Sequence, residues 1–259
     1  MIFRLTTMLG IAAYLLIASP FVLAGLPETL EKIRGSIVAV GTLTPVRHPN
    51  AKKPQAKFSG TGFVVGNGRQ IITNHHVIPE SLDRENGEGL AIFTGRGESA
   101  NGHTAKVVRT DPEHDLALLE ISGAALPAME LDGLSSVREG EEVAFTGFPL
   151  GMVLGLYPAT NKSIVSAITP VVMPARTARN LTPQQIKRLK TPFEIYQLDA
   201  ISYPGFSGSP LYNIETGKVV GVLNSVFVKD TKESLLSSPS GITYAIPVKY
   251  VHELLKTRK

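Results

Sequence analysis

The chain has 259 residues, of which 43% are hydrophobic, and it contains neither cysteine nor tryptophan. This length allows one large or two small domains with a substantial core, and the hydrophobic content excludes an intrinsically disordered chain. The formal net charge of +4 is too small to indicate nucleic-acid binding, and the lack of cysteine excludes any disulfide.

The first 24 residues have the features of an export signal. Arg4 is the one charged residue before Glu28, and the segment between them is apolar. Pro20 would break its helix, and "VLA", ending at Ala24, supplies the small residues that a signal peptidase requires. We therefore expect residues 1–24 to be a cleaved signal peptide of an exported bacterial protein, periplasmic or secreted. The alternative is a retained inner-membrane anchor, because the uncharged segment could span about 30 Å of hydrocarbon.

After residue 35 the chain consists of short β-branched segments separated by Gly, Pro, Asn and Asp. This spacing predicts an all-β protein, either a barrel or a sandwich. Asn67-Gly68 marks the turn of one hairpin. The Gly-, Pro- and Ser-containing stretch 123–140 divides the segments into two groups, so we expect an N-terminal β domain at 28–125 and a C-terminal β domain at 126–259.

Three segments are expected to be helical. Residues 26–34 form a short amphipathic lead-in. Residues 181–190 carry a capping box that begins at Thr182. Residues 248–259 close the chain as a helix with basic residues at its C-terminal end, where they suit the helix dipole.

The catalytic candidates come from three short stretches. "ITNHHV" supplies two histidines at a strand end, "DPEHDLALLEI" supplies Asp115, and "DAISYPGFSGSPLYN" supplies Ser207 in a loop rich in Gly and Pro. A serine hydroxyl needs a histidine to accept its proton and a carboxylate to orient that histidine. The order His, Asp, Ser therefore indicates a nucleophilic triad. Adjacent strand residues point to opposite faces, so only one of His75 and His76 is expected to serve the site.

The serine loop also offers an oxyanion hole. Gly205 can adopt backbone angles that other residues avoid, so its N–H and that of Ser207 can point into one pocket. Taken singly, each motif could be an ordinary turn, strand end or cap. A lipase-type Gly-x-Ser-x-Gly elbow would need Gly in place of Ser209, and the sequence has no zinc-binding His-Glu-x-x-His motif. We expect neither a metal nor another cofactor.

These stretches, together with "GTGFVV", "GFPLG" and "GITYAIPVKYV", resemble the trypsin-like serine proteases of chymotrypsin fold, and more closely the bacterial HtrA/Deg branch. The similarity covers roughly residues 28–257. It implies two perpendicular six-stranded antiparallel β-barrels with the triad in the cleft between them. It also implies serine endopeptidase activity.

The resemblance assigns the triad residue by residue. The family pattern Thr-Asn-x-His-Val falls on residues 73–77, which makes His76 the general base and His75 the variable residue. The family's aspartate falls on Asp115 and its nucleophile on Ser207.

Four features depart from the family pattern. Phe206 stands where Asn or Asp usually precedes the serine, which excludes activation by a new N-terminus that pairs with that Asp. Ser209 replaces the usual second Gly. The segment from Pro170 to Pro192 is a longer insertion than this region usually carries. The chain stops at Lys259 without the PDZ domains of most HtrA proteins, so PDZ-guided substrate capture is not expected.

The position six before the nucleophile sets the floor of the specificity pocket in this fold, and here it is Ile201. No acid lies there to pair with Lys or Arg, and the resemblance puts Asp199, eight residues before Ser207, outside the pocket. The expected pocket residues are Ile201, Leu223, Ser225 and Val226. An uncharged pocket disfavours a Lys or Arg head group, so we expect cleavage after small or medium apolar residues.

The leading interpretation is an exported serine endopeptidase that cleaves unfolded or envelope proteins through an acyl-enzyme. Its partners would be protein or peptide substrates, and no nucleic acid is expected. Two alternatives are a protease-like binding or chaperone module with weak or regulated catalysis, and a structural envelope protein with an inactive triad.

Overall fold

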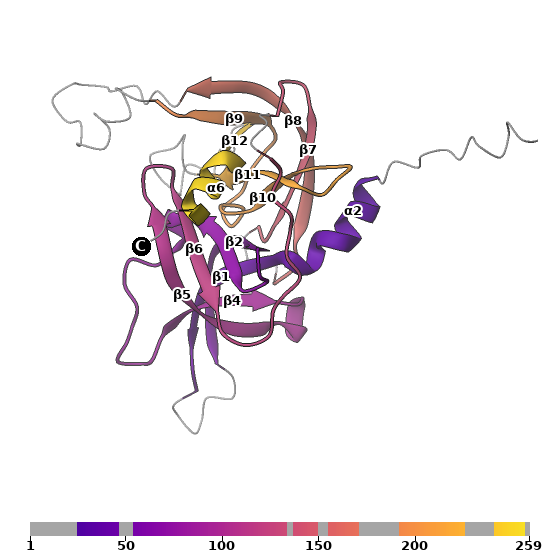
Figure 1. Ribbon diagram of the computed structural model, residues 1–259. Helices are drawn as coiled ribbons and strands as arrows, with labels where there is room; N and C mark the ends of the chain where they lie inside the picture. The colour runs from indigo at the N-terminus through magenta and orange to yellow at the C-terminus, as the bar shows by residue number, and fades with distance from the viewer. Residues whose placement is uncertain are drawn as a thin grey trace, which may run out of the picture.

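The computed structural model describes residues 25–46, 54–133, 137–149, 155–170, 192–225 and 241–256. Within these residues, twelve antiparallel strands close into two barrels of six strands each (Figure 1). The expectation of two six-stranded antiparallel barrels is therefore confirmed.

The two barrels have the same topology. The first has the strand order β1-β2-β3-β6-β5-β4, and the second has the equivalent order β7-β8-β9-β12-β11-β10. The first barrel comprises β1 Ile37–Thr44, β2 Gln55–Val65, β3 Gln70–Asn74, β4 Gly89–Thr94, β5 Asn101–Asp111 and β6 Leu116–Ile121. The second comprises β7 Glu142–Gly147, β8 Ala159–Pro170, β9 Glu194–Asp199, β10 Pro210–Asn213, β11 Val219–Asn224 and β12 Ile242–Pro247. The turn at residues 66–69 joins β2 to β3, as Asn67-Gly68 predicted.

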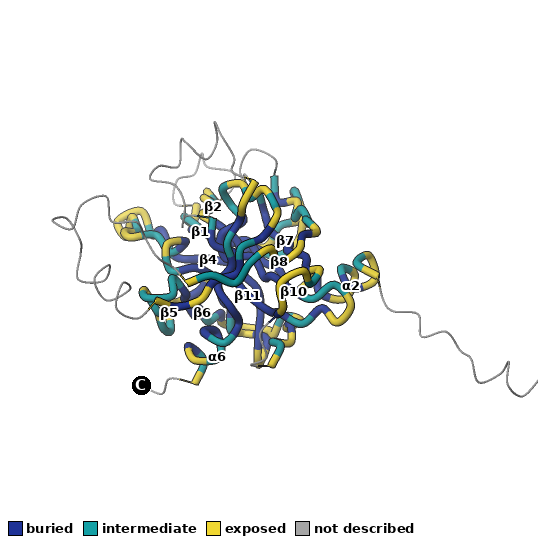
Figure 2. The backbone as a smooth tube through the Cα atoms, turned by 90° about the horizontal axis from the view of Figure 1, so that it is seen from above, coloured by how far each residue is buried: buried dark blue, intermediate teal, exposed yellow. Residues whose placement is uncertain are grey.

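Several strands are buried on both faces. In β1, Val38 and Val40 belong to the core of the first barrel, whereas Ile37 and Ala39 belong to a cluster that also contains Tyr212 of the second barrel. Side chains of a strand alternate between faces, so one face fills the barrel and the other fills the layer between the barrels. This explains why the β1 sequence is apolar throughout. Figure 2 shows the buried backbone gathered in the strands of both barrels.

Helix α2, Leu26–Ile33, precedes the first barrel in the chain but packs on the second. Its buried residues are Thr29 and Ile33, and the Thr29 hydroxyl donates a 2.7 Å hydrogen bond to the carbonyl of Ile214. A Cβ at Gly217 would lie 3.2 Å from both of these helix side chains, so glycine allows the close approach. The amphipathic segment predicted at 26–34 is therefore confirmed as a helix.

Helix α6, Val248–Lys256, follows the second barrel and contacts both barrels. Its buried face packs on β11 and β12 and also on β5 and β6. Arg109 of β5 donates from Nη1 to the carbonyls of Leu254, at 2.5 Å, and Leu255, at 3.2 Å, where a cation suits the helix dipole. The C-terminal helix expected from the sequence is confirmed.

Some expectations lie outside the described residues. These are the signal peptide or anchor at 1–24, most of the insertion between Pro170 and Pro192, and the helix near Thr182. Among the helices that are described, none is long and apolar enough to cross a membrane.

The packing predicts that two aromatic residues contribute very differently to the free energy of unfolding. Phe63 of β2 is fully buried, whereas Tyr157 is 58% exposed. Phe63→Ala should lower the free energy of unfolding by about 3–5 kcal/mol, because it leaves a cavity between tightly packed strands. Tyr157→Ala should change it by less than about 0.5 kcal/mol. Urea denaturation of both variants measures this, and similar losses would contradict the assignment of Phe63 to the core.

Candidate active site

Asp115 occupies a strained turn between β5 and β6. Its φ of 52° makes it the one non-glycine residue with positive φ among the described residues. The left-handed conformation costs roughly 1–2 kcal/mol, although Asp tolerates it better than most residues. The Asp115 carbonyl accepts hydrogen bonds from the His75 N–H and from Asn74 Nδ2, both at 3.0 Å. These bonds hold the turn against the end of β3.

The Asp115 carboxylate orients His76. Its Oδ2 lies 2.5 Å from His76 Nδ1, and its Oδ1 accepts the backbone N–H of His76 at 2.9 Å. The two side chains are 29% and 16% exposed, so the pair lies at the surface of the cleft rather than in the core. Because Nδ1 faces the carboxylate, Nε2 is the ring nitrogen left for proton transfer.

The histidine pair lies beyond the strand, contrary to the sequence interpretation. Strand β3 ends at Asn74, and residues 75–77 form a short 3-10 helix, η2. In such a helix successive side chains are about 120° apart rather than on opposite faces. The separation of His75 from His76 therefore arises from a helical turn.

Asn224, the last residue of β11, was not predicted as a site residue. Its Nδ2 donates a 2.6 Å hydrogen bond to Oδ2 of Asp115, the same oxygen that faces His76. Asn224 is 1% exposed. The sequence signal was a lone amide side chain that ends the apolar run "VVGVLN", and buried polar groups of this kind usually have a specific partner.

The loop of Ser207 is held by neighbouring strands. The Gly208 N–H donates to the carbonyl of Leu223 at 3.0 Å, and the Ser225 N–H donates to Oγ of Ser207 at 3.4 Å. Asn224, which binds Asp115, lies between these two residues in the sequence. Three consecutive residues of one segment therefore contact both the serine loop and the aspartate. This segment thus connects Asp115, and through it His76, to the loop of Ser207.

Thr61 of β2 joins the serine loop to the first barrel, and this role was also missed. Its N–H donates to the carbonyl of Ser207 at 2.9 Å, and its hydroxyl donates to the carbonyl of Gly205 at 2.7 Å. The Thr61 carbonyl accepts the hydroxyl of Thr73 at 2.7 Å. A Cβ at Gly208 would lie only 2.0 Å from that carbonyl oxygen, so this close approach requires glycine.

Two backbone donors of the loop remain available. Gly205 has a φ of 103°, and neither its N–H nor that of Ser207 has a hydrogen-bond partner among the described residues. Phe206, between them, is 1% exposed and packs edge-on against Phe145, with ring centroids 5.3 Å apart. The aromatic ring is therefore part of the core of the second barrel.

The predicted pocket residues have different surroundings. Ile201 is 43% exposed, and Ser225 is partly buried, with its hydroxyl 2.7 Å from that of Ser202. Leu223 is fully buried in the core of the second barrel, so its side chain does not line an open pocket. Val226 lies outside the described residues. No group of His, Asp and Glu side chains in the described part of the chain has the arrangement of a metal site.

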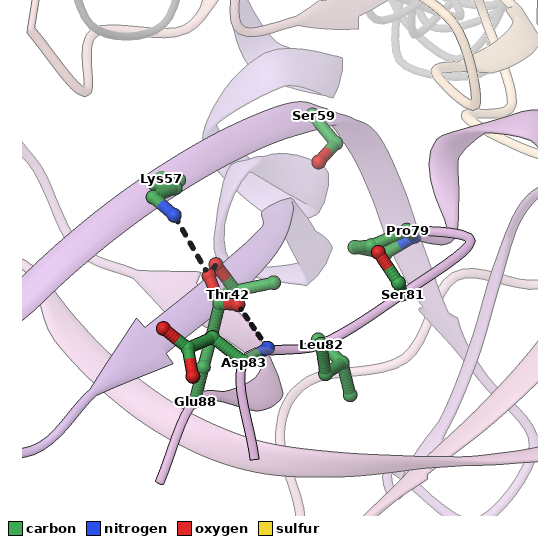
Figure 3. A pocket seen from close by; sticks show the side chains of 8 residues that line it. All are labelled: Thr42, Lys57, Ser59, Pro79, Ser81, Leu82, Asp83 and Glu88. Carbon is green, nitrogen blue, oxygen red and sulfur yellow. Dashed lines mark hydrogen bonds and ion pairs between the residues drawn. The ribbon is translucent and has the colours of Figure 1, made fainter. Parts of the chain in front are cut away.

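A pocket of about 430 Å³ lies on the first barrel, between β1, β2 and the segment that follows η2. The lining residues are Thr42, Lys57, Ser59, Pro79, Ser81, Leu82, Asp83 and Glu88 (Figure 3). Most of these side chains are polar, so the pocket is a polar cavity.

Glu88 organises this pocket. Its side chain is 7% exposed and accepts the N–H of Asp83 at 2.8 Å, the hydroxyl of Thr42 at 2.7 Å and Nζ of Lys57 at 3.2 Å (Figure 3). These donors, the Asp83 N–H foremost, lower the pKa of the Glu88 carboxyl to about 2. The carboxylate thus ties the loop that follows η2 to β1 and β2.

Comparison with known proteins agrees with this geometry. A model of the trypsin-like peptidase domain matches residues 60–222, more than half of the chain. The chain therefore belongs to the family of trypsin-like peptidase domains.

The similar curated proteins are bacterial. A probable periplasmic serine endoprotease, DegP-like, from Pseudomonas savastanoi pv. phaseolicola is 30% identical over 226 residues, which cover 87% of this chain and 40% of that protein. A protein of the same description from Pseudomonas putida is 30% identical over 197 residues, which cover 76% and 34%. The chain thus spans well under half the length of these relatives. The recognised similarity to the HtrA/Deg branch is confirmed.

Solved structures support the fold. The HtrA-type protease AlgW with a decapeptide superposes with a TM-score of 0.64 at 23% identity, covering 89% of this chain and 66% of that one. The active form of the Rv3671c protease from M. tuberculosis gives 0.61 at 20% identity, covering 88% and 82%. The chymotrypsin-like two-barrel fold is therefore shared with known proteases.

The pKa of Glu88 leads to a pH-dependent prediction. Its folded pKa lies below the unfolded value, so the carboxylate stabilises the native state above about pH 4.3, and this contribution is lost as the pH falls toward 2. Glu88→Gln should lower the melting temperature at pH 7, and the difference from the wild type should shrink between about pH 4.3 and 2. Thermal melts across this range measure it. Glu130→Gln, at a side chain 78% exposed, is the control and should have little effect at any pH.

Proposed function

We propose that this chain is a serine endopeptidase in which Ser207 is the nucleophile, His76 the general base and Asp115 the orienting carboxylate. The observation that carries the proposal is the 2.5 Å contact between Asp115 and His76, in a cleft where β11 binds both Asp115 and the loop of Ser207. The family membership of residues 60–222 supports it.

The reaction follows from the roles of these groups. The Ser207 Oγ attacks the carbonyl carbon of the scissile peptide bond while its proton passes to Nε2 of His76. The carbonyl oxygen becomes an oxyanion that accepts the N–H groups of Gly205 and Ser207. When the C–N bond breaks, the leaving amine takes the proton from the imidazolium and an acyl-enzyme remains. Water then repeats the sequence with His76 as the base and releases the carboxylic acid.

Asp115 stabilises the imidazolium at the moment it forms. The carboxylate is itself held by donors from both barrels, His76 from the first and Asn224 from the second. Charge that is positioned before the reaction needs no reorganisation during it, which is the main source of this kind of stabilisation.

The resting geometry is not fully closed. Among the described residues, no hydrogen bond joins Oγ of Ser207 to the ring of His76, and Oγ instead accepts the long bond from the Ser225 N–H. Catalytic hydrogen bonds of this kind often form only when substrate binds. We infer that a bound peptide brings Oγ to Nε2.

This resting geometry favours one second candidate function. A protein that binds an unfolded partner and cleaves it slowly would have the same fold and site. A fluorophosphonate probe distinguishes the two, because stoichiometric labelling of Ser207 supports the peptidase. Phe206, next to Ser207, is buried in the core of the second barrel, which is compatible with the peptidase.

The substrate is proposed to carry a small or medium apolar residue before the cut bond. Ile201 and Ser225 flank the expected pocket and bring no charge, while Asp199 is exposed at the end of β9, eight residues before Ser207. An uncharged pocket would strip water from a Lys or Arg head group without offering a counter-charge.

Export of this chain is also part of the proposal. The apolar segment of residues 1–24 reads as a signal peptide, and the similar curated proteins are described as periplasmic. Unfolded or envelope proteins are then the substrates that the enzyme would meet.

The two adjacent histidines provide a direct test of the triad. His76→Ala should reduce kcat by about 10⁶, the size of the effect when a triad histidine is removed. His75→Ala should keep most of the activity, because its backbone N–H, which binds Asp115, is retained. Asp115→Asn should cost about 10⁴ in kcat. Steady-state kinetics on an unfolded protein substrate measure these values, and equal losses from the two histidine variants, both folded, would contradict the assignment.

Cleavage specificity tests the pocket. Digestion of a peptide library should give cuts mainly after Val, Ala, Ile or Leu, with weak discrimination among them, since one methylene is worth only about 1–3 kcal/mol. Ser207→Ala is the matched control and should give no cuts above background. Cleavage dominated by Lys or Arg would place the pocket elsewhere and point to Asp199.

A further inference from the structure

A second histidine–aspartate pair lies in the turn that carries Asp115. Nδ1 of His114 lies 2.6 Å from Oδ2 of Asp111, the last residue of β5. The other oxygen of Asp111 accepts the N–H groups of Glu113, at 3.1 Å, and of His114, at 3.2 Å. The carboxylate of Asp111 thus accepts hydrogen bonds from within the turn and holds the His114 side chain, the residue before Asp115, in place.

The ring of His114 belongs to the first barrel but packs on elements of the second. It stacks on Tyr250 of α6, with centroids 4.0 Å apart and planes at 18°. It also meets the edge of Phe193, just before β9, at 4.7 Å and 71°. Only 15% of the His114 side chain is exposed. The turn of Asp115 is therefore clamped between its own barrel and an aromatic surface of the other.

Asp115 needs such support from both sides. Among the described residues, the hydrogen bonds to its carbonyl come from Asn74 and His75, at the end of β3. On its N-terminal side, Asp115 has a positive φ, and its orientation depends on the peptide group that precedes it. That peptide joins His114 to Asp115. A change in the position of His114 can therefore reach Asp115 through a single peptide bond.

We propose that His114 is a positioning residue: its ring, seated on Tyr250 and Phe193, sets the orientation of Asp115 according to how α6 is docked on the first barrel. The proposal deepens the serine peptidase function proposed above and rests on it. The part of His114 that matters is the aromatic ring in contact with Tyr250, while the hydrogen bond to Asp111 holds that ring in place.

The first test measures the pair that His114 should position. The proton in the short bond between His76 and Asp115 is expected to give a strongly downfield ¹H resonance. In His114→Ala this resonance should move or broaden, because the carboxylate that shares the proton is displaced. His103→Ala is the matched control, since His103 lies on the same strand β5 and contacts Thr94 at 3.0 Å, away from the second barrel.

Kinetics give the second readout. His114→Ala should lower kcat by about 10–100-fold with KM little changed, because sub-ångström misplacement affects the chemical step more than binding. Tyr250→Leu removes the same stacking from the other side and keeps the apolar bulk, so the test does not depend on one variant folding. The double variant should lose no more than either single variant, as expected for two residues acting through one contact. His114→Phe keeps the aromatic ring but loses the hydrogen bond to Asp111, so it should restore most of the kcat that His114→Ala loses.

The outcomes separate this proposal from the function on which it rests. A wild type that turns over no substrate would count against the peptidase, while the ¹H resonance would still decide the role of His114. Additive losses for His114→Ala and Tyr250→Leu would overturn the proposal. So would a His114→Ala variant that loses only melting temperature, or a His114→Phe variant as impaired as His114→Ala.

Discussion

The rest of the site depends on the hydrogen bonds that the Asp115 carboxylate accepts. They come from the ring and the backbone N–H of His76 in one barrel and from the side-chain amide of Asn224 in the other. A carboxylate that is fixed by several donors can hold an imidazole in one orientation and one tautomer. The backbone strain at Asp115 is the cost of presenting that group from so short a turn.

The two-barrel architecture supplies donors from opposite sides. Thr61 reaches from β2 to the loop of Ser207, and β11 reaches back to Asp115, so each barrel binds the functional segment of the other. The strands that carry these residues are buried on both faces, which leaves little freedom for one barrel to shift alone. The precision of the site therefore follows from packing between the barrels as much as from packing within them.

Much of this arrangement could be predicted from the sequence. Short β-branched segments indicated an all-β chain, and the motifs around His76, Asp115 and Ser207 carried recognisable chemistry in local stretches. The resemblance to known proteases then supplied the pairing of barrels and the choice between His75 and His76. Local patterns were enough to find these three motifs, because each motif lies within one short stretch of sequence.

The features that the sequence did not predict are those that depend on distant contacts. Nothing local distinguishes Thr61 from other strand threonines, since its role arises from a serine loop more than 140 residues away. Asn224 and Leu223 are neighbours, yet one binds the aspartate and the other is fully buried, because strand alternation and the barrel wall decide which way each points. The 3-10 turn at His75 was likewise hidden by a strand-like run of residues.

Helix α2 packs on the barrel from which it is distant in sequence, and α6 packs on both barrels, which has a consequence for biogenesis. Because chains emerge from the ribosome or a translocon N-terminus first, β1–β6 can pair while the segment that bears Ser207 is still unfolded. At that stage α2 has no partner surface, Asp115 lacks its second-barrel donor, and the loop of Ser207 is not yet formed. The proposed triad would thus be assembled only in the last step of folding.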